Sequence, residues 1–148
     1  MKTIMYILFF AVLLYSGALL SGEPEVEHYS SRPEMQLPFS EAVRVGDMLY
    51  LSGSIGNIPG TLELAEDGIA GETRQALENI KATLEKHGSE LGEVVKCTVF
   101  MADISEWAAM NEVYITFFPV DPPARSALGV NGLAIGARVE IECFAAMR

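Results

Sequence analysis

Histidine, cysteine and positive charge are all scarce in this chain of 148 residues. It contains two histidines, two cysteines and 10 basic residues against 20 acidic ones, which gives a formal net charge of −10. Nucleic-acid binding depends on basic patches, so this acidic balance argues against a nucleic-acid partner. No CxxC pair or Cys/His cluster is present, and neither His28 nor His87 lies in a partner motif. We therefore expect no metal and no cofactor.

The two cysteines, Cys97 and Cys143, lie in apolar, strand-like stretches. In an oxidising compartment they could form a disulfide, but that bond requires Cα atoms within about 7 Å, which a sequence does not show. The alternative is that both are small, buried hydrophobic side chains. On the sequence we favour the second interpretation.

Long apolar runs are confined to the beginning of the chain, where IMYILFFAVLLYSGALL follows Lys2 without a charge. A charged start, an apolar run and small residues before an acidic stretch are typical of a secretory signal peptide, here residues 1–22. The alternative is an uncleaved membrane anchor, because the run approaches the ~18 residues that a span requires. We expect an exported protein, periplasmic or secreted, with no membrane contact unless the leader stays uncut.

The rest of the chain has the length of one globular domain. Residues 23–36 contain two prolines and many polar side chains, which predicts a flexible N-terminal tail, and the domain follows over 37–148. Alternating and helical apolar patterns predict its elements. In order, these are a hairpin with strands at 41–45 and 48–53, a helix over 72–88, a strand within 93–103, a helix over 104–119, and strands at 125–130 and 137–146.

Each predicted helix has one apolar stripe, so both should cover the same face of a single mixed sheet in an α+β fold. The stripe of the second helix is aromatic, with Trp107, Met110, Tyr114 and Phe117, and predicts core packing. In the strand before it, Val95, Cys97 and Val99 should face the core. The other sheet face has no cover within the chain, which predicts an oligomer.

Arg125 begins a predicted strand after Pro122 and Pro123 and is surrounded by small residues. An arginine there is usually a surface ion-pair partner. However, the two prolines make the backbone before Arg125 rigid, and the small neighbouring side chains leave space beside the guanidinium. A fixed guanidinium in a small-walled hollow is suited to binding a carboxylate through two hydrogen bonds.

Glu140 and Glu142 lie on the face of the last predicted strand opposite Val139, Ile141 and Cys143. Such a pair is ordinarily the solvated face of a sheet. If another subunit covers that face, one glutamate could act as a general base toward water. The SGS stretch at 52–54 ends a strand with small residues, which permits close backbone approach to a ligand.

Four segments together resemble the Rid family, the reactive intermediate deaminases also called YjgF-like proteins. They read LPFSEAVRVGDMLYLSG, GETRQALENIKATLE, VVKCTVFMADISEWAAMNEVY, and PPARSALGV followed by VEIECFA. The resemblance covers about residues 37–146, with the segments in the family's order. The proline–alanine–arginine–serine stretch before the glutamate-rich last strand is its most specific part.

The resemblance implies a homotrimer with a chorismate-mutase-like (YjgF-like) fold and active sites in clefts between subunits. Arg125 would hold the carboxylate of a 2-imino acid such as 2-iminopropanoate or 2-iminobutanoate. Glu140 would orient a water that attacks the imine carbon, releasing a 2-keto acid and ammonia. The other substrate-binding residues that the resemblance implies are Phe39, Ser52, Gly53, Asn111 and Ala127.

Three positions depart from the family pattern. Phe39 stands where active members usually have tyrosine, so a hydroxyl that could bond substrate or water is missing. One hydrogen bond to a charged group is worth about 1.5–3 kcal/mol. Ser54 replaces the usual glutamine, and Ala127 stands where many active members have cysteine, which matters little if only the backbone there contacts the ligand.

Two functions therefore compete. The first is an exported imine deaminase in which Arg125 orients the substrate and Glu140 supplies acid–base help. The alternative is a non-catalytic trimer whose clefts bind small carboxylates, or whose surface binds proteins, and Phe39 favours it. RNA cleavage has been attached to relatives, but net charge and export argue against it here.

Overall fold

The computed structural model describes residues 25–30 and 38–148. The predicted signal peptide lies outside the described residues, as does most of the predicted tail. The two helices are α1 (Gly68–Lys86) and α2 (Trp107–Phe117). The strands are β1 (Val26–Tyr29), β2 (Ala42–Val45), β3 (Met48–Leu51), β4 (Ser54–Ile55), β5 (Val94–Met101), β6 (Ala124–Gly129) and β7 (Val139–Ala146).

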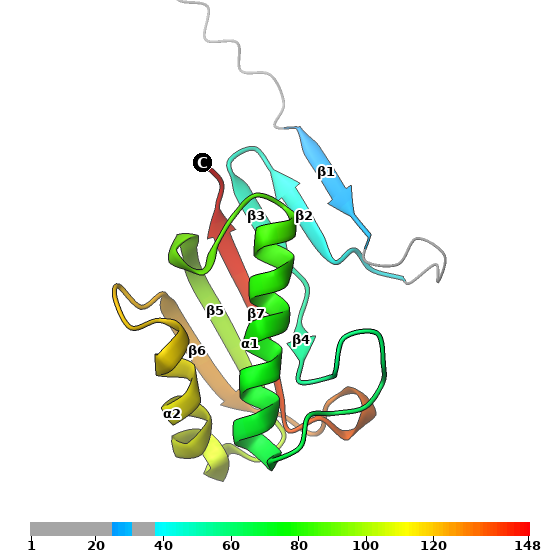
Figure 1. Cartoon of the computed structure of the whole chain (residues 1–148), viewed down its shortest axis with the longest axis vertical. Helices are drawn as coiled ribbons and strands as arrows, with labels where there is room; N and C mark the ends of the chain where they lie inside the picture. Colours follow the sequence, from blue (N-terminus) through cyan, green and yellow to red (C-terminus); the bar gives the residue numbers. More distant parts are fainter. Residues whose placement is uncertain (1–24, 31–37) are drawn as a thin grey trace, which may run out of the picture.

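The strands form one mixed sheet in the order β1-β2-β3-β7-β5-β6, with β4 also pairing β7. Among the strand pairs of the described residues only β5–β6 is parallel, because α2 crosses over between these two strands. Both helices lie on the same face of the sheet, α1 over its centre and α2 beside β6 (Figure 1). The predicted α+β fold is confirmed. Neither helix in the described part of the chain has the length and apolar character needed to cross a membrane.

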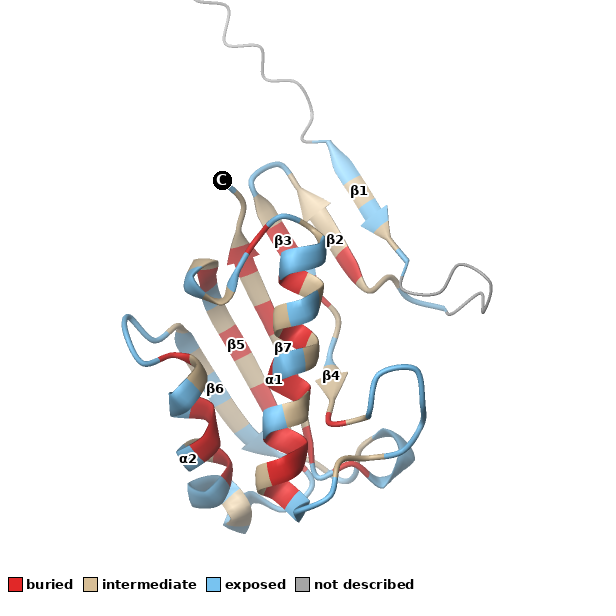
Figure 2. Ribbon diagram, viewed as in Figure 1, coloured by how far each residue is buried: buried red, intermediate tan, exposed pale blue. Residues whose placement is uncertain are grey.

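The core lies between the helices and the sheet, where buried residues alternate along β5 and β7 (Figure 2). The stripe of α1, with Leu77, Ile80 and Leu84, packs against it as predicted. In α2, Met110 and Tyr114 are buried, but Trp107 is 43% exposed, so the core prediction is wrong for the indole.

The face opposite the helices is rich in apolar groups. The register places Tyr50 beside Phe144 and Phe100 beside Leu128 there. Tyr50 is 40% and Leu128 41% exposed, and the rings of Tyr50 and Phe144 lie 5.1 Å apart. No helix of the described residues covers this face (Figure 1).

Val95 also departs from the sequence-based expectation. Between Val94 and Lys96 the register of β5 against β7 shifts, which is the mark of a β-bulge. The extra residue reverses the alternation locally, so Val94 is buried and Val95 is 46% exposed. From Cys97 onward the predicted buried face is confirmed.

Part of the predicted tail is a strand. Val26–Tyr29 pairs antiparallel with β2, with Tyr29 opposite Ala42, and adds an edge to the sheet. The Tyr29 ring stacks on His87 at a centroid distance of 4.2 Å. Polar composition and prolines predicted a tail, but hydrogen bonds to a neighbouring strand and this stacking order residues 26–29.

Glu41 connects this edge to the end of α1. Its Oε1 accepts a hydrogen bond from Lys86 Nζ at 2.8 Å and lies 2.8 Å from His87 Nε2. Burial disfavours the charged form of Glu41, but hydrogen bonds from Lys86 and His87 outweigh burial and hold its pKa below the ordinary value of a glutamate.

Because the pKa of Glu41 is lowered by folding, its contribution to stability exists above the unfolded-state pKa and disappears as the pH falls through the folded-state pKa. Glu41→Gln should therefore cost about 1 kcal/mol at pH 7. The difference from wild type should shrink as the pH falls below 4.5. Urea unfolding of both proteins across this range is the measurement, and a difference independent of pH would contradict the assignment.

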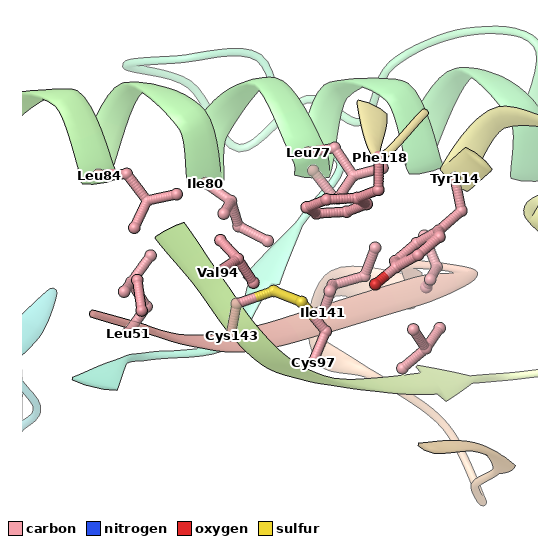
Figure 3. Close-up of a cluster of buried hydrophobic side chains, with 14 of the residues drawn as sticks. Leu51, Leu77, Ile80, Leu84, Val94, Cys97, Tyr114, Phe118, Ile141 and Cys143 are labelled. Atoms are coloured by element: carbon pink, nitrogen blue, oxygen red, sulfur yellow. A yellow bond between two sulfur atoms is a disulfide. The ribbon is translucent and has the colours of Figure 1, made fainter. Parts of the chain in front are cut away.

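Cys97 and Cys143 form a disulfide, and the sequence-based preference for two separate buried thiols is wrong. The two residues are direct partners on the antiparallel strands β5 and β7, with Cα atoms 4.2 Å apart. Figure 3 shows the bond at the centre of the core, facing α1. Adjacency of two strands far apart in the sequence is not visible in the residue pattern.

Removing this cross-link should lower stability substantially. Replacing both Cys97 and Cys143 by alanine should cost about 2–4 kcal/mol, because the bond closes a loop between residues 46 positions apart in the unfolded chain. Dithiothreitol should shift the urea midpoint of wild type in the same direction and leave the double variant unchanged. A wild-type midpoint insensitive to reductant would show that the thiols are not joined.

Candidate functional site

Arg125 lies on β6 directly opposite Cys97 of β5, and therefore on the helix-covered face of the sheet. Its guanidinium carbon is 4.5 Å from the ring centroid of Tyr114 and 5.6 Å from that of Trp107. Both rings come from α2, and such cation–π contacts hold a guanidinium in place without using its N–H donors. The plane of Arg125 is thus fixed while its fork stays available for a carboxylate.

A hollow of about 280 Å³ opens beside Arg125. Asn111 adds a carboxamide to it, and Pro122 and Pro123 form part of its wall, as the sequence suggested. Ala127 lies two residues further along β6 and packs against the core. Arg125 and Asn111 therefore form one group between α2 and β6, which we call the arginine half-site, whereas Ala127 is not among the residues that line the hollow.

Tyr114 also lines the hollow, and its ring reaches from α2 toward the sheet (Figure 3). Burial raises the pKa of Tyr114 to about 12, against a smaller lowering by the charge of Arg125. The phenol is therefore neutral at any physiological pH and cannot act as a base. Its hydroxyl is buried and has no hydrogen-bond partner among the described residues.

A second group is built around a break between β3 and β4. Tyr50 lies opposite Phe144 and Ser54 opposite Ile141, so the three residues 51–53 on one side face only two, 142 and 143, on the other. Ser52 and Gly53 form this irregularity, which is the count of a β-bulge, a feature that re-aims side chains beside active sites. A Cβ on Gly53 would lie 1.9 Å from Glu140 Oε1, so the Glu140 carboxylate occupies the space that glycine leaves open.

Ser52 holds the neighbouring segment in place. Its hydroxyl donates a 2.6 Å hydrogen bond to the Ser40 carbonyl, and its backbone N–H donates to the Glu41 carbonyl at 3.0 Å. Phe39, the next residue back, is 58% exposed. Ser52, Gly53 and Glu140 thus form what we call the glutamate half-site, in which the Ser52 hydroxyl is already engaged, and Phe39 adjoins this half-site through its chain neighbour Ser40.

The two half-sites do not meet within one chain. Arg125 shares the helix-covered face with Cys97 and Cys143, whereas Glu140, three residues before Cys143, lies on the opposite face. Strand β5 also separates β6 from β7. A single cleft that contains both Arg125 and Glu140 therefore needs a second copy of the chain.

Trp107 and Tyr114 are site residues that the sequence-based analysis missed, because it assigned the aromatic stripe to the core. The spacing of seven positions, two helical turns, shows in the sequence that the two rings lie on one side of the helix. The sequence does not show which strand this side of the helix faces. Within residues 25–30 and 38–148, no group of His, Cys, Asp or Glu side chains could hold a metal ion.

Comparison with known proteins identifies the family. Residues 29–147 match the family described as Endoribonuclease L-PSP. The 2-iminobutanoate/2-iminopropanoate deaminase of Mus musculus is 41% identical over 108 residues, covering 73% of this chain and 80% of that protein. The chloroplastic Reactive Intermediate Deaminase A of Arabidopsis thaliana is 34% identical over 138 residues, covering 93% of this chain and 73% of that protein.

A solved structure gives the same result. The YjgF gene product of E. coli superimposes with a TM-score of 0.75 at 35% identity, covering 82% of this chain and 99% of that one. The chain belongs to the YjgF/Rid family, which is the family matched under the description Endoribonuclease L-PSP. The resemblance seen in the sequence is confirmed.

Proposed function

We propose that the protein hydrolyses 2-imino acids to 2-keto acids and ammonia. The observation that carries this proposal is the Arg125 guanidinium, which two aromatic rings hold at an open hollow and which has no hydrogen-bond or ion-pair partner among residues 25–30 and 38–148. Such a group suits the planar carboxylate that every 2-imino acid carries. Relatives with deaminase names support the assignment at about 40% identity.

The reaction needs a water on the imine carbon. Once Arg125 fixes the carboxylate, the carbon next to it has a defined position, and Glu140 from a second subunit accepts a proton as water adds. Because the imine nitrogen is protonated when water adds, the resulting carbon bears a hydroxyl and a neutral amine. Glu140 then gives its proton to the amine nitrogen, the C–N bond breaks as ammonia leaves, and the hydroxyl returns a proton to Glu140 as it becomes the ketone.

A homotrimer is the assembly we propose, since Arg125 and Glu140 require two copies and the apolar face opposite the helices needs a cover. Tyr50, Phe144 and Leu128 supply that face. Light scattering on the chain from Glu23 onward should give three times the monomer mass. A stable monomer would remove the cleft and the catalytic proposal with it.

We also propose an exported protein, either periplasmic or secreted. The Cys97–Cys143 disulfide supports this location, because disulfides persist in oxidising compartments and are rare in the cytosol. Intact mass of the protein from its native host tests the leader, and a full-length species in the membrane fraction would favour the anchor.

The decisive assay adds purified protein, lacking residues 1–22, to an amino-acid oxidase that generates 2-imino acids. Imine decay should accelerate in proportion to the protein added. Free imines already hydrolyse in water, so each rate is compared with that of a heat-denatured sample. Binding of 2-keto acids without acceleration would favour the alternative, a non-catalytic trimer that binds small carboxylates, and the missing hydroxyl at Phe39 supports that alternative.

RNA cleavage, suggested by the family's description, has less support in this chain. A formal net charge of −10 repels a phosphate backbone, and phosphate contacts depend on lysine and arginine.

A further inference from the structure

The hollow beside Arg125 is larger and more apolar than the smallest 2-imino acids require. Arg125 and Asn111 supply the polar groups of its lining, and Tyr114 contributes its ring, because the Tyr114 hydroxyl is buried. The apolar lining residues are Ile115, Phe118, Pro122 and Pro123. A carboxylate on the guanidinium would therefore leave the substrate's own side chain against these walls.

The volume supports the same conclusion. An engineered apolar cavity of about 150 Å³ is large enough to bind benzene. The hollow here is about 280 Å³, so it has room for a carboxylate and a side chain of benzyl size together. The methyl side chain of 2-iminopropanoate would leave most of the apolar wall in contact with water.

Ile115 is an exposed aliphatic residue that lines the hollow. It lies four residues after Asn111 on α2, which puts both on one side of the helix, and it is 55% exposed. Ile115 is a large aliphatic side chain at the rim of the hollow and is about half exposed to water. An apolar ligand that covers it would bind more tightly, because apolar surface is removed from water. Phe118 is buried at the same hollow and provides an aromatic wall.

We infer that the site prefers 2-imino acids with large apolar side chains, of the kind formed by oxidation of leucine or phenylalanine. This inference rests on the proposed function for the carboxylate and the imine, and adds the side-chain specificity. Phe39 is consistent with it, because an exposed phenyl ring without a hydroxyl gives the glutamate half-site an apolar surface as well.

The test compares imines generated from alanine, leucine and phenylalanine, each expressed as acceleration over its uncatalysed hydrolysis. Wild type should favour the phenylalanine-derived imine over the alanine-derived one by at least about tenfold in kcat/KM. Ile115→Gln should reduce kcat/KM for the phenylalanine-derived imine about four- to tenfold. The loss of kcat/KM for the alanine-derived imine should be smaller, because a methyl side chain buries little apolar surface against Ile115.

Ile58→Gln is the matched control, because Ile58 is also an exposed isoleucine but lies outside the hollow. This change should alter kcat/KM for neither the phenylalanine-derived nor the alanine-derived imine. Equal acceleration of all three imines, or an equal loss for all three in Ile115→Gln, would overturn the specificity while leaving the deaminase intact.

Calorimetry with phenylpyruvate and pyruvate separates the two proposals. If no imine is accelerated but phenylpyruvate binds at least about tenfold more tightly than pyruvate, with the preference reduced in Ile115→Gln, the side-chain pocket stands and the deaminase fails. If neither keto acid binds, or both bind equally, the side-chain pocket is wrong.

Discussion

Replacing Arg125 by alanine should abolish acceleration of 2-imino acid hydrolysis and weaken 2-keto acid binding by at least about 100-fold. The magnitude follows from losing two charge-assisted hydrogen bonds to one carboxylate, each worth about 1.5–3 kcal/mol. Stability should fall by no more than about 1 kcal/mol, because the guanidinium is half-buried and contributes only its stacking on Tyr114 and Trp107. Oxidase-coupled kinetics, calorimetry and urea unfolding measure the three quantities.

Arg125→Lys is the informative companion, because it keeps the charge and removes the planar fork. It should recover only a small part of the activity. If Arg125→Ala instead unfolds the protein, and wild type shows neither imine chemistry nor keto-acid binding, the arginine is a structural residue and the enzyme proposal is wrong.

Gly53→Ala should lower turnover about 100-fold while leaving the protein folded. The new Cβ would lie 1.9 Å from Glu140 Oε1 and 2.8 Å from Cδ, so the carboxylate has to leave its position. The loss should match that of a displaced general base, whose usual contribution is on the order of 100-fold or more. The fold should survive, because the atoms that must move belong to the end of a flexible side chain.

Glu140→Gln provides the comparison. It should lower kcat to a similar extent while 2-keto acid affinity stays near that of wild type, because the proposed work of Glu140 is on water. Gly92→Ala is the control for glycine replacement, since the nearest atom to its new Cβ is 3.8 Å away. Full activity in Gly53→Ala would show that the position of the Glu140 carboxylate does not matter to catalysis.

Local signals in the sequence were sufficient for most of the fold. Gly46, between the predicted strands at 41–45 and 48–53, has φ 56°, and Gly88, at the end of the predicted helix, has φ 80°; glycine adopts this left-handed backbone without steric cost. Apolar periodicity identified both helices and the alternation of β7. Interactions between distant segments were not visible: the pairing of β1 with β2, the disulfide, and the bulge at Val95 all depend on which strands become neighbours.

The candidate site was likewise predictable from the sequence only in part. The candidate residues can be read directly from the sequence, and the period of two along one strand places Glu140 and Ile141 on opposite faces of the sheet. That Arg125 and Glu140 lie on different faces of the sheet depends on the pairing of β5 with both β6 and β7, which is a property of the assembled sheet. The stacking of Trp107 and Tyr114 on Arg125 depends on the same assembly.

The separation of the two half-sites has a genetic consequence. In the proposed trimer every subunit gives its arginine half-site to one cleft and its glutamate half-site to a different one. When Arg125→Ala and Glu140→Gln chains are assembled together, some clefts combine the intact half of each and regain full function. Two inactive alleles would then complement each other in one cell, whereas two alleles damaged in the same half-site would not.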